Sequence, residues 1–262
     1  MSIGVYLLMR PQFDESHRKF LDEFLPGENQ WREEDRSTPA ERLVEFAGRV
    51  CYMSFGRHQA PGTNADYIRK LISNEHESVL EHAVWTILIS GVSRAFTHQL
   101  VRHRVGFAFS QLSQQYHDES NIRFVRPPGI DQVPELAQVW DKAVREAQSA
   151  YRTIIDRLAT NTVPQLLEPP REALRAMRSA ARSVLPNASE TVIVVTANAR
   201  ALRHFFKVRG GIVGDLEMRC VAARLLETIR PEAPALFSDF SIEHPSDGFP
   251  LVVHRPLVEK RS

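Results

Sequence analysis

Apolar residues recur every three or four positions along much of the chain, and this spacing predicts a protein rich in helices. The clearest case is residues 133–159, where the spacing is sustained over many turns and indicates a scaffold helix. Further helices are expected at about residues 39–52, 63–74, 93–104, 170–185, 199–209 and 215–229.

Shorter apolar runs predict strands between these helices. The three strand-like runs are Ile3–Met9, Trp85–Gly91 and Glu190–Ala197, and residues 109–116 are expected to be extended. The remaining stretches favour irregular structure: polar residues 10–37, the loop 55–62, the turn 124–129, and the tail from Phe237 as short strand or coil.

Two segments carry a capping-box pattern, in which a hydroxyl side chain is followed three residues later by glutamate. In the first, Thr38 to Glu41, a proline occupies the first helical position. The second, Ser78 to Glu81, is flanked by His76 and His82, and acids and histidines this close also suggest a metal site. The two histidines are six residues apart and no His-Glu-x-x-His motif is present, so we favour a helix cap with hydrogen-bonded loop histidines over a metal site.

Composition narrows the class of protein. The chain has 262 residues, enough for one large domain or two small ones, and its 33 Lys and Arg against 32 Asp and Glu give a net charge of +1. This balance argues against a nucleic-acid binder. Two cysteines make no disulfide framework, which favours a cytoplasmic protein. The apolar runs are too short to span a membrane, and we expect neither a signal peptide nor a membrane partner.

Arginine, histidine, glutamine and serine dominate the segments that suggest chemistry. Arg171, Arg175, Arg178 and Arg182 follow one stripe of a predicted helix; we expect a solvated face for three of them, with one reaching a phosphate. Arg209 falls on the apolar face of its helix, where an unpaired charge is costly, so it needs a partner or a ligand. These side chains bind phosphates and heterocycles but offer no evident nucleophile. The residues alone indicate a cofactor-dependent enzyme that acts on a phosphorylated heterocycle.

An ordered set of motifs resembles the flavin-dependent thymidylate synthases. Arg-His-Arg at 102–104 is followed by Ser-Gln-Leu-Ser-Gln-Gln-Tyr at 110–116, which is similar to the signature of that family. Four flanking segments resemble family segments in the same order: Glu45–Tyr52, Ser78–His82, Leu185–Glu190 and Arg203–Phe205. The likeness extends over roughly residues 40 to 240.

The resemblance implies both a fold and a reaction. The fold would be of the thymidylate synthase-complementing type, an α/β (α+β) arrangement with a mixed central sheet flanked by helices, forming a single domain over residues 1–262 of a homotetramer with shared active sites. The reaction would be a methyltransferase reaction of dTMP biosynthesis. FAD is reduced by NADPH, and a methylene from methylenetetrahydrofolate becomes the methyl group on carbon 5 of the uracil in dUMP. No enzyme nucleophile attacks the ring.

The resemblance also assigns residues. Those expected to hold the flavin are Ser78, Arg102, His103, Arg104, Gln111, Asn198, Arg200 and His204. Those expected to bind the nucleotide are Arg94, Gln99, Arg102, Gln111, Leu112, Ser113, Gln114, Gln115, Arg182 and Arg209. Arg209 would also be catalytic, because its charge would stabilise negative charge that develops on the uracil ring. Ser113 would be a ligand of the nucleotide and not a nucleophile.

Two departures from the family pattern suggest a variant. The spacer from Val105 to Leu112 is one residue longer than usual, and Gln115 stands where the family commonly has a nucleotide-binding arginine. Some relatives in nucleoside-antibiotic pathways methylate UMP, and this chain could act on UMP in their manner. Two alternatives remain: a family member that binds flavin or nucleotide without methylating, and a nucleophile-dependent methyltransferase that uses Cys51 or Cys220.

Overall fold

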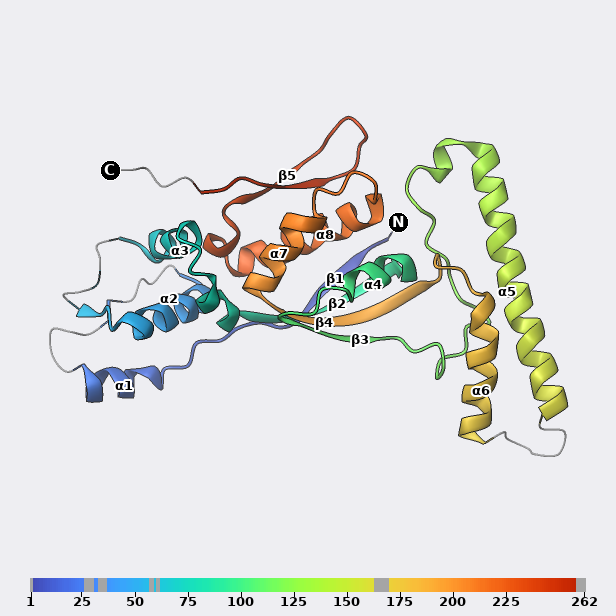
Figure 1. Ribbon diagram of the computed structural model, residues 1–262, viewed down its shortest axis with the longest axis horizontal. Helices are drawn as coiled ribbons and strands as arrows, with labels where there is room; N and C mark the ends of the chain where they lie inside the picture. Colours follow the sequence, from blue (N-terminus) through green and yellow to red (C-terminus); the bar gives the residue numbers. More distant parts are fainter. Residues whose placement is uncertain are drawn as a thin grey trace. The chain divides into compact units, whose positions relative to one another are not determined.

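The computed structural model describes residues 2–25, 31–32, 37–56, 59, 62–162 and 170–257. Four strands form one sheet in the order β1-β2-β4-β3, and two more form a hairpin. The bounds are β1 Gly4–Met9, β2 Val84–Ser93, β3 Phe107–Gln111, β4 Glu190–Asn198, β5 Phe240–Glu243 and β6 Leu251–His254. The prediction of a chain that mixes helices with a central sheet is confirmed (Figure 1).

Backbone hydrogen bonds set the direction of the inner strands. Leu112 N–H donates to Val192 O, and Asn198 N–H donates to Gly106 O, so β3 and β4 run antiparallel. Every second residue of β4 is buried, including Ile193. This alternation gives β4 one buried face.

The chain forms two compact units, and it passes between them within β1, β2, β3 and β4 and also between Arg102 and His103. The first unit comprises Met1–Gly4, Ile89–Arg102 and Phe109–Val194, and the second comprises Val5–Leu88, His103–Ala108 and Val195–Ser262. The single domain over residues 1–262 stays a prediction.

The first unit contains the longest helix of the described residues, α5, which lies beside α6 (Figure 1). Tyr151 of α5 is fully buried, as expected of a scaffold helix. The helices of this unit are α4 Arg94–Leu100, α5 Pro134–Thr162 and α6 Arg171–Ala181, with 3-10 turns η4 Ile130–Gln132 and η5 Arg182–Val184.

The second unit contains most of the apolar core, which includes Ile68, Leu80, Phe205 and Phe237. Its α-helices are α1 His17–Phe24, α2 Pro39–Tyr52, α3 Asn64–Ser73, α7 Ala199–Arg209 and α8 Leu216–Ile229. Its 3-10 turns are η3 Glu77–His82, η6 Arg230–Glu232 and η7 Ala235–Phe237. The helix predicted from the cap at Thr38 is confirmed, and the helix expected at about 63–74 also begins at a complete capping box, formed by Thr63 and Asp66.

Three predictions of local structure are wrong. Residues 10–37 contain helix α1, whose N-cap Ser16 makes no capping bond; packing of Leu21 against Trp31 and Phe55 stabilises it instead. The pattern at Ser78 is no helix cap, because residues 77–82 form a 3-10 helix without a side-chain cap. In the described residues, no three metal-ligating side chains come together there or elsewhere.

The third error concerns α4, which ends at Leu100 and not at Arg104. Arg102 N–H donates to Gln99 O in a closing turn, and His103 lies beyond the helix. Residues 109–116, expected to be extended, are strand only as far as Gln111 and then turn. Part of the predicted loop 55–62 lies outside the described residues.

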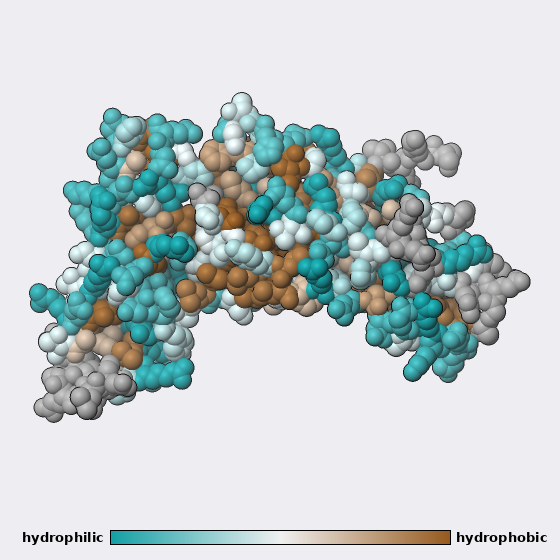
Figure 2. Space-filling view, turned by 180° about the vertical axis from the view of Figure 1, so that it is seen from behind, coloured by the Kyte–Doolittle hydropathy of each residue, from teal (hydrophilic) through white to brown (hydrophobic). Residues whose placement is uncertain are grey.

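The outer strand β1 exposes apolar side chains. Tyr6 and Leu8 are each 56% exposed, and Met9 is 43% exposed. Figure 2 shows hydrophobic residues gathered in the middle of one face of the molecule. No helix of the described ranges is both long and apolar enough to cross a membrane.

Candidate functional site

The second unit carries a group of polar residues on and around α7, here called the α7 group: His103, Gly106, Asn198, Arg200, His204 and Arg209. Asn198 begins the helix, and its side-chain oxygen accepts from Ala201 N–H at 2.8 Å. Gly106 lies against this cap with a φ of +73°, and a Cβ there would be 2.7 Å from Asn198 Nδ2. Only glycine allows the segment after His103 to approach α7 so closely.

His103 and Arg209 are hydrogen-bonded to each other. Arg209 Nε donates to His103 Nε2 at 3.2 Å, so the imidazole is neutral and carries its proton on Nδ1. Burial, the charge of Arg209 and the neighbouring His204 together lower the pKa of His103. The edge of its ring packs against Phe205 at 5.4 Å between centroids. Arg209 therefore has the partner that its apolar face requires, and its other donors make no hydrogen bond to a described residue.

The first turn of α7 is tied to η3. Arg200 Nη1 donates to Glu81 Oε1 at 2.6 Å, and Arg200 Nε lies 3.7 Å from Glu77 Oε2. Ser78 lies between the two acids in sequence and is exposed. The predicted flavin ligands Ser78 and Arg200 are thus on adjoining elements, whereas Arg104 is exposed on the connection to β3.

A buried ion pair that the sequence analysis missed fixes α7 in its unit. The Arg203 guanidinium binds both carboxylate oxygens of Asp239, at 2.6 and 2.7 Å, and His254 Nε2 lies 2.9 Å from the same carboxylate. Burial raises the pKa of Asp239, but the hydrogen bonds and charge of Arg203 outweigh burial and lower it below the usual value. The partners are far apart in sequence, so no local pattern could have revealed the pair.

The first unit carries the second group, the segment from Gln111 to Tyr116. Gln111 Nε2 donates to Thr97 Oγ1 at 3.0 Å, which fixes the end of β3 to α4. Arg94 Nη2 donates to Leu112 O at 2.8 Å, and Ser113 Oγ accepts from Gln115 N–H at 3.3 Å. The structure therefore places Arg94 beside residues 111–115, and their role in binding a nucleotide stays a prediction.

Two donors, one in this segment and one on α4 beside it, are buried without a hydrogen-bond partner among the described residues. Arg94 Nε and Gln114 Nε2 are buried and make no hydrogen bond to any described residue. Burial lowers the pKa of Arg94; Glu119 opposes this shift and Arg182 adds to it. An unsatisfied buried donor costs about 1–3 kcal/mol, and functional sites are a common place for such a cost.

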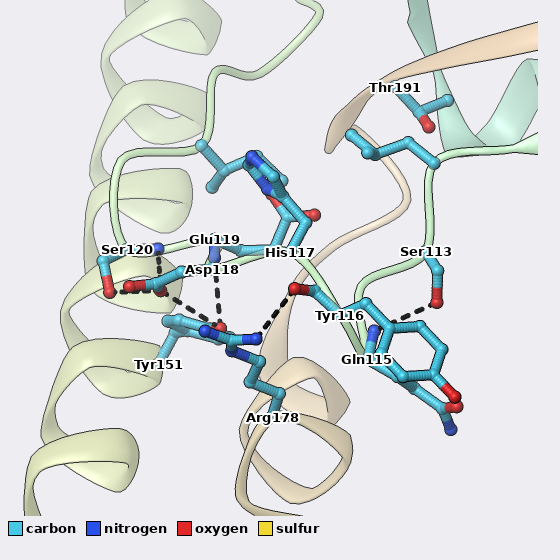
Figure 3. A network of polar contacts seen from close by, with 12 residues as sticks. Ser113, Gln115, Tyr116, His117, Asp118, Glu119, Ser120, Tyr151, Arg178 and Thr191 are labelled. Carbon is cyan, nitrogen blue, oxygen red and sulfur yellow. Dashed lines mark hydrogen bonds and ion pairs between the residues drawn. The ribbon is translucent and has the colours of Figure 1, made fainter. Parts of the chain in front are cut away.

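The arginines of α6 face the same segment. The guanidiniums of Arg171 and Arg175 lie 5.5 and 5.7 Å from the centroid of the Tyr116 ring. Arg178 Nη1 donates to Tyr116 O at 2.7 Å, as Figure 3 shows. Arg171 is exposed and the Arg175 side chain is 43% exposed, so the face is solvated as predicted even though its arginines also contact Tyr116. Arg182, the member of the stripe predicted to bind the nucleotide, is half-buried at the start of η5.

A polar network joins Tyr151 of α5 to Asp118 and Glu119, which follow the segment in the chain (Figure 3). Tyr151 OH accepts from Glu119 N–H at 3.1 Å and lies 3.5 Å from Asp118 Oδ1. The side chain of Glu119 is buried, which raises its pKa. These residues were not predicted from the sequence, in which the one local signal is Tyr151 itself, a polar ring in an otherwise apolar stripe.

Gln99 and Arg102 lie at the exposed end of α4. Among the described residues, neither side chain hydrogen-bonds to the 111–116 segment, so the structure does not join them to the other predicted nucleotide ligands.

Comparison with known proteins identifies the family. Residues 35–235 match the model of a family described as thymidylate synthase complementing protein. The chain belongs to this family. The match includes the α7 group, the 111–116 segment and the arginines of α6, so all three features lie within the family's shared sequence.

Individual relatives agree with the family match. A flavin-dependent thymidylate synthase of Mycobacterium avium (strain 104) is 44% identical over 230 residues, which cover 87% of this chain and 89% of that protein. The protein of the same name from Mycolicibacterium vanbaalenii is 46% identical over 79% of this chain and 82% of that protein. The one from Corynebacterium diphtheriae is 42% identical over 85% of this chain and 88% of that protein.

Proposed function

We propose that this chain is a FAD-dependent methyltransferase that methylates carbon 5 of the uracil in dUMP. Methylenetetrahydrofolate would supply the carbon and NADPH the reducing equivalents. The observation that carries the proposal is the high identity to flavin-dependent thymidylate synthases over most of both chains. The two groups of polar residues supply ligands suited to an anionic cofactor and an anionic substrate.

The α7 group fits FAD in its chemistry. FAD carries a pyrophosphate, and the group combines exposed cationic side chains with a helix N-terminus beside Gly106. The residues proposed to hold the flavin are Ser78, Arg102, His103, Arg104, Gln111, Asn198, Arg200 and His204. When bound, FAD would supply the hydride that completes the methyl group.

The 111–116 segment fits a nucleotide. Backbone and side-chain donors from Gln111 to Gln115 are proposed to bind the uracil and the sugar phosphate, together with Arg94, Gln99, Arg102 and Arg182. Arg209 is proposed to stabilise negative charge on the uracil, since His103 holds its guanidinium through one nitrogen only. No cysteine is needed; burial raises the pKa of Cys220, which makes its thiol a poor nucleophile.

Two measurements together test the proposal: the absorption spectrum of the bound flavin and the turnover of dUMP. The purified protein should be yellow, should bleach with NADPH, and should convert dUMP to dTMP when methylenetetrahydrofolate is added. Flavin that bleaches without any methylated product would favour the alternative of a non-methylating flavin protein. A protein that takes up no FAD would exclude the proposal.

A separate question is whether the protein distinguishes the deoxyribose of dUMP from the ribose of UMP. We propose that UMP is tolerated beside dUMP, because Gln115 and the longer spacer change the segment next to the nucleotide. Parallel turnover with the two nucleotides decides this, and strict rejection of UMP would exclude the altered-sugar hypothesis while leaving dUMP methylation intact.

We also propose a cytoplasmic homotetramer. The exposed apolar residues of β1 support self-association, because an outer strand with Tyr6 and Leu8 in water is an unfavourable surface for a lone chain. Light scattering after gel filtration gives the mass of the assembly, and a monomer would contradict the proposal.

A further inference from the structure

Gln115 is held by two side chains of α6. Its side-chain nitrogen donates to Ser179 Oγ at 2.9 Å, and its side-chain oxygen accepts from Arg175 Nε at 3.3 Å. The neutral amide therefore positions a guanidinium beside the turn that contains Ser113. This position is the one where the family resemblance leads us to expect an arginine.

Arg175 retains donors for a ligand. Its Nε is used by Gln115, and its Nη1 lies 3.3 Å from Glu172 Oε2. The Arg175 and Glu172 side chains are 43% and 76% exposed, and ion pairs at such exposure are weak. A dianionic phosphate can therefore displace Glu172, and the planar guanidinium is suited to binding two phosphate oxygens at once.

The surroundings also favour an anion. Arg171 and Arg178 approach Tyr116 from the same helix. The side-chain nitrogen of Gln114, a residue only 6% exposed, has no hydrogen-bond partner among the described residues. The turn thus combines several cations with an unused buried donor.

We propose that Arg175 is a specificity-determining residue for the substrate phosphate: it supplies from α6 the positive charge that the turn itself lacks at Gln115. This inference rests on the proposed function, which identifies the ligand of the turn as a uracil nucleotide. Gln115 acts as a positioning residue that holds Arg175 without adding charge. If both position 115 and position 175 held an arginine, the two guanidiniums would lie close together and repel each other.

The experiment measures binding rather than turnover. The dissociation constants of dUMP and of deoxyuridine, which lacks the phosphate, are determined by calorimetry for the wild type and for Arg175→Gln. Glutamine preserves helix propensity, and FAD content reports whether the variant assembles. Arg157→Gln, at an exposed position of α5 in the same unit, is the matched control. The double variant Arg175→Gln with Gln115→Arg returns the charge to the turn.

Arg175→Gln should weaken dUMP binding by about tenfold to a hundredfold and leave deoxyuridine binding unchanged. Arg157→Gln should change neither, and the double variant should recover most of the lost dUMP affinity. Unchanged dUMP binding in Arg175→Gln, or an equal loss for both ligands, would overturn the role of Arg175. A wild type that binds neither ligand would overturn the proposed function, and this inference with it.

Discussion

The buried Arg203–Asp239 pair gives the sharpest test of how α7 is held in place. Asp239→Asn keeps the shape of the side chain but removes the charge that compensates Arg203. The Arg203 side chain is only 1% exposed, so its charge cannot be hydrated after the change. Leu236 O, 2.6 Å from Arg203 Nη1, would remain as a neutral partner, and Glu77 Oε1, 4.0 Å from Arg203 Nε, would remain as a more distant carboxylate.

Removing one member of a buried ion pair costs about 3–5 kcal/mol, because the remaining charge is left uncompensated. A typical domain is stable by only about 5–15 kcal/mol, so the loss is a large fraction of the total. The assay is urea unfolding of FAD-loaded wild type and variant at one protein concentration, with the midpoint and slope giving the free energy of unfolding. Arg255→Gln, which breaks the exposed pair with Glu243 in the same hairpin, is the control and should cost at most about 1 kcal/mol.

The same pair predicts a pH dependence. The pKa of Asp239 is lower in the folded protein than in the unfolded chain. Its contribution to the free energy of unfolding is therefore complete above about pH 4, the ordinary pKa of aspartate. This contribution is lost as the pH falls through the lower pKa of the folded protein. The difference between wild type and Asp239→Asn should therefore shrink in acid. If Asp239→Asn cost no more than Arg255→Gln at neutral pH, the reasoning about the buried pair would be refuted.

Three further predictions concern the site. Arg209→Ala should retain FAD yet lose methylation about 100-fold to 1000-fold, since it removes charge stabilisation and not cofactor binding; full activity would exclude the assigned role. Gly106→Ala should lower the free energy of unfolding by at least about 1–2 kcal/mol and weaken FAD retention, because the positive φ and the contact with Asn198 leave no room for a Cβ; an unchanged urea midpoint would contradict this. The double variant of Cys51 and Cys220 to serine should keep its turnover, whereas an inactive protein would favour the nucleophile-dependent alternative.

Local chemistry explains which elements the sequence could predict. The helix start at Thr38 could be predicted because the capping residue lies three positions from its partner Glu41. The strand β4 could be predicted for a similar reason, since the apolar run that forms it is local. The family motifs then indicated which polar residues belong to the site.

Tertiary contacts explain what the sequence could not predict. Helix α1 is stabilised by aromatic packing from outside the helix, and α4 ends before its helical pattern does because His103 packs on Phe205. The pairing of Arg175 with Gln115 likewise joins residues that are 60 positions apart. None of these contacts is encoded in local propensity or periodicity.

The central claim is that the chain methylates a uracil nucleotide with the help of bound FAD. The most direct measurement incubates the FAD-loaded protein with NADPH, methylenetetrahydrofolate and dUMP, and follows the nucleotide by mass spectrometry. Conversion to dTMP that depends on both NADPH and the folate is the expected result. Recovery of unmodified dUMP from protein whose flavin has been fully reduced would contradict the claim.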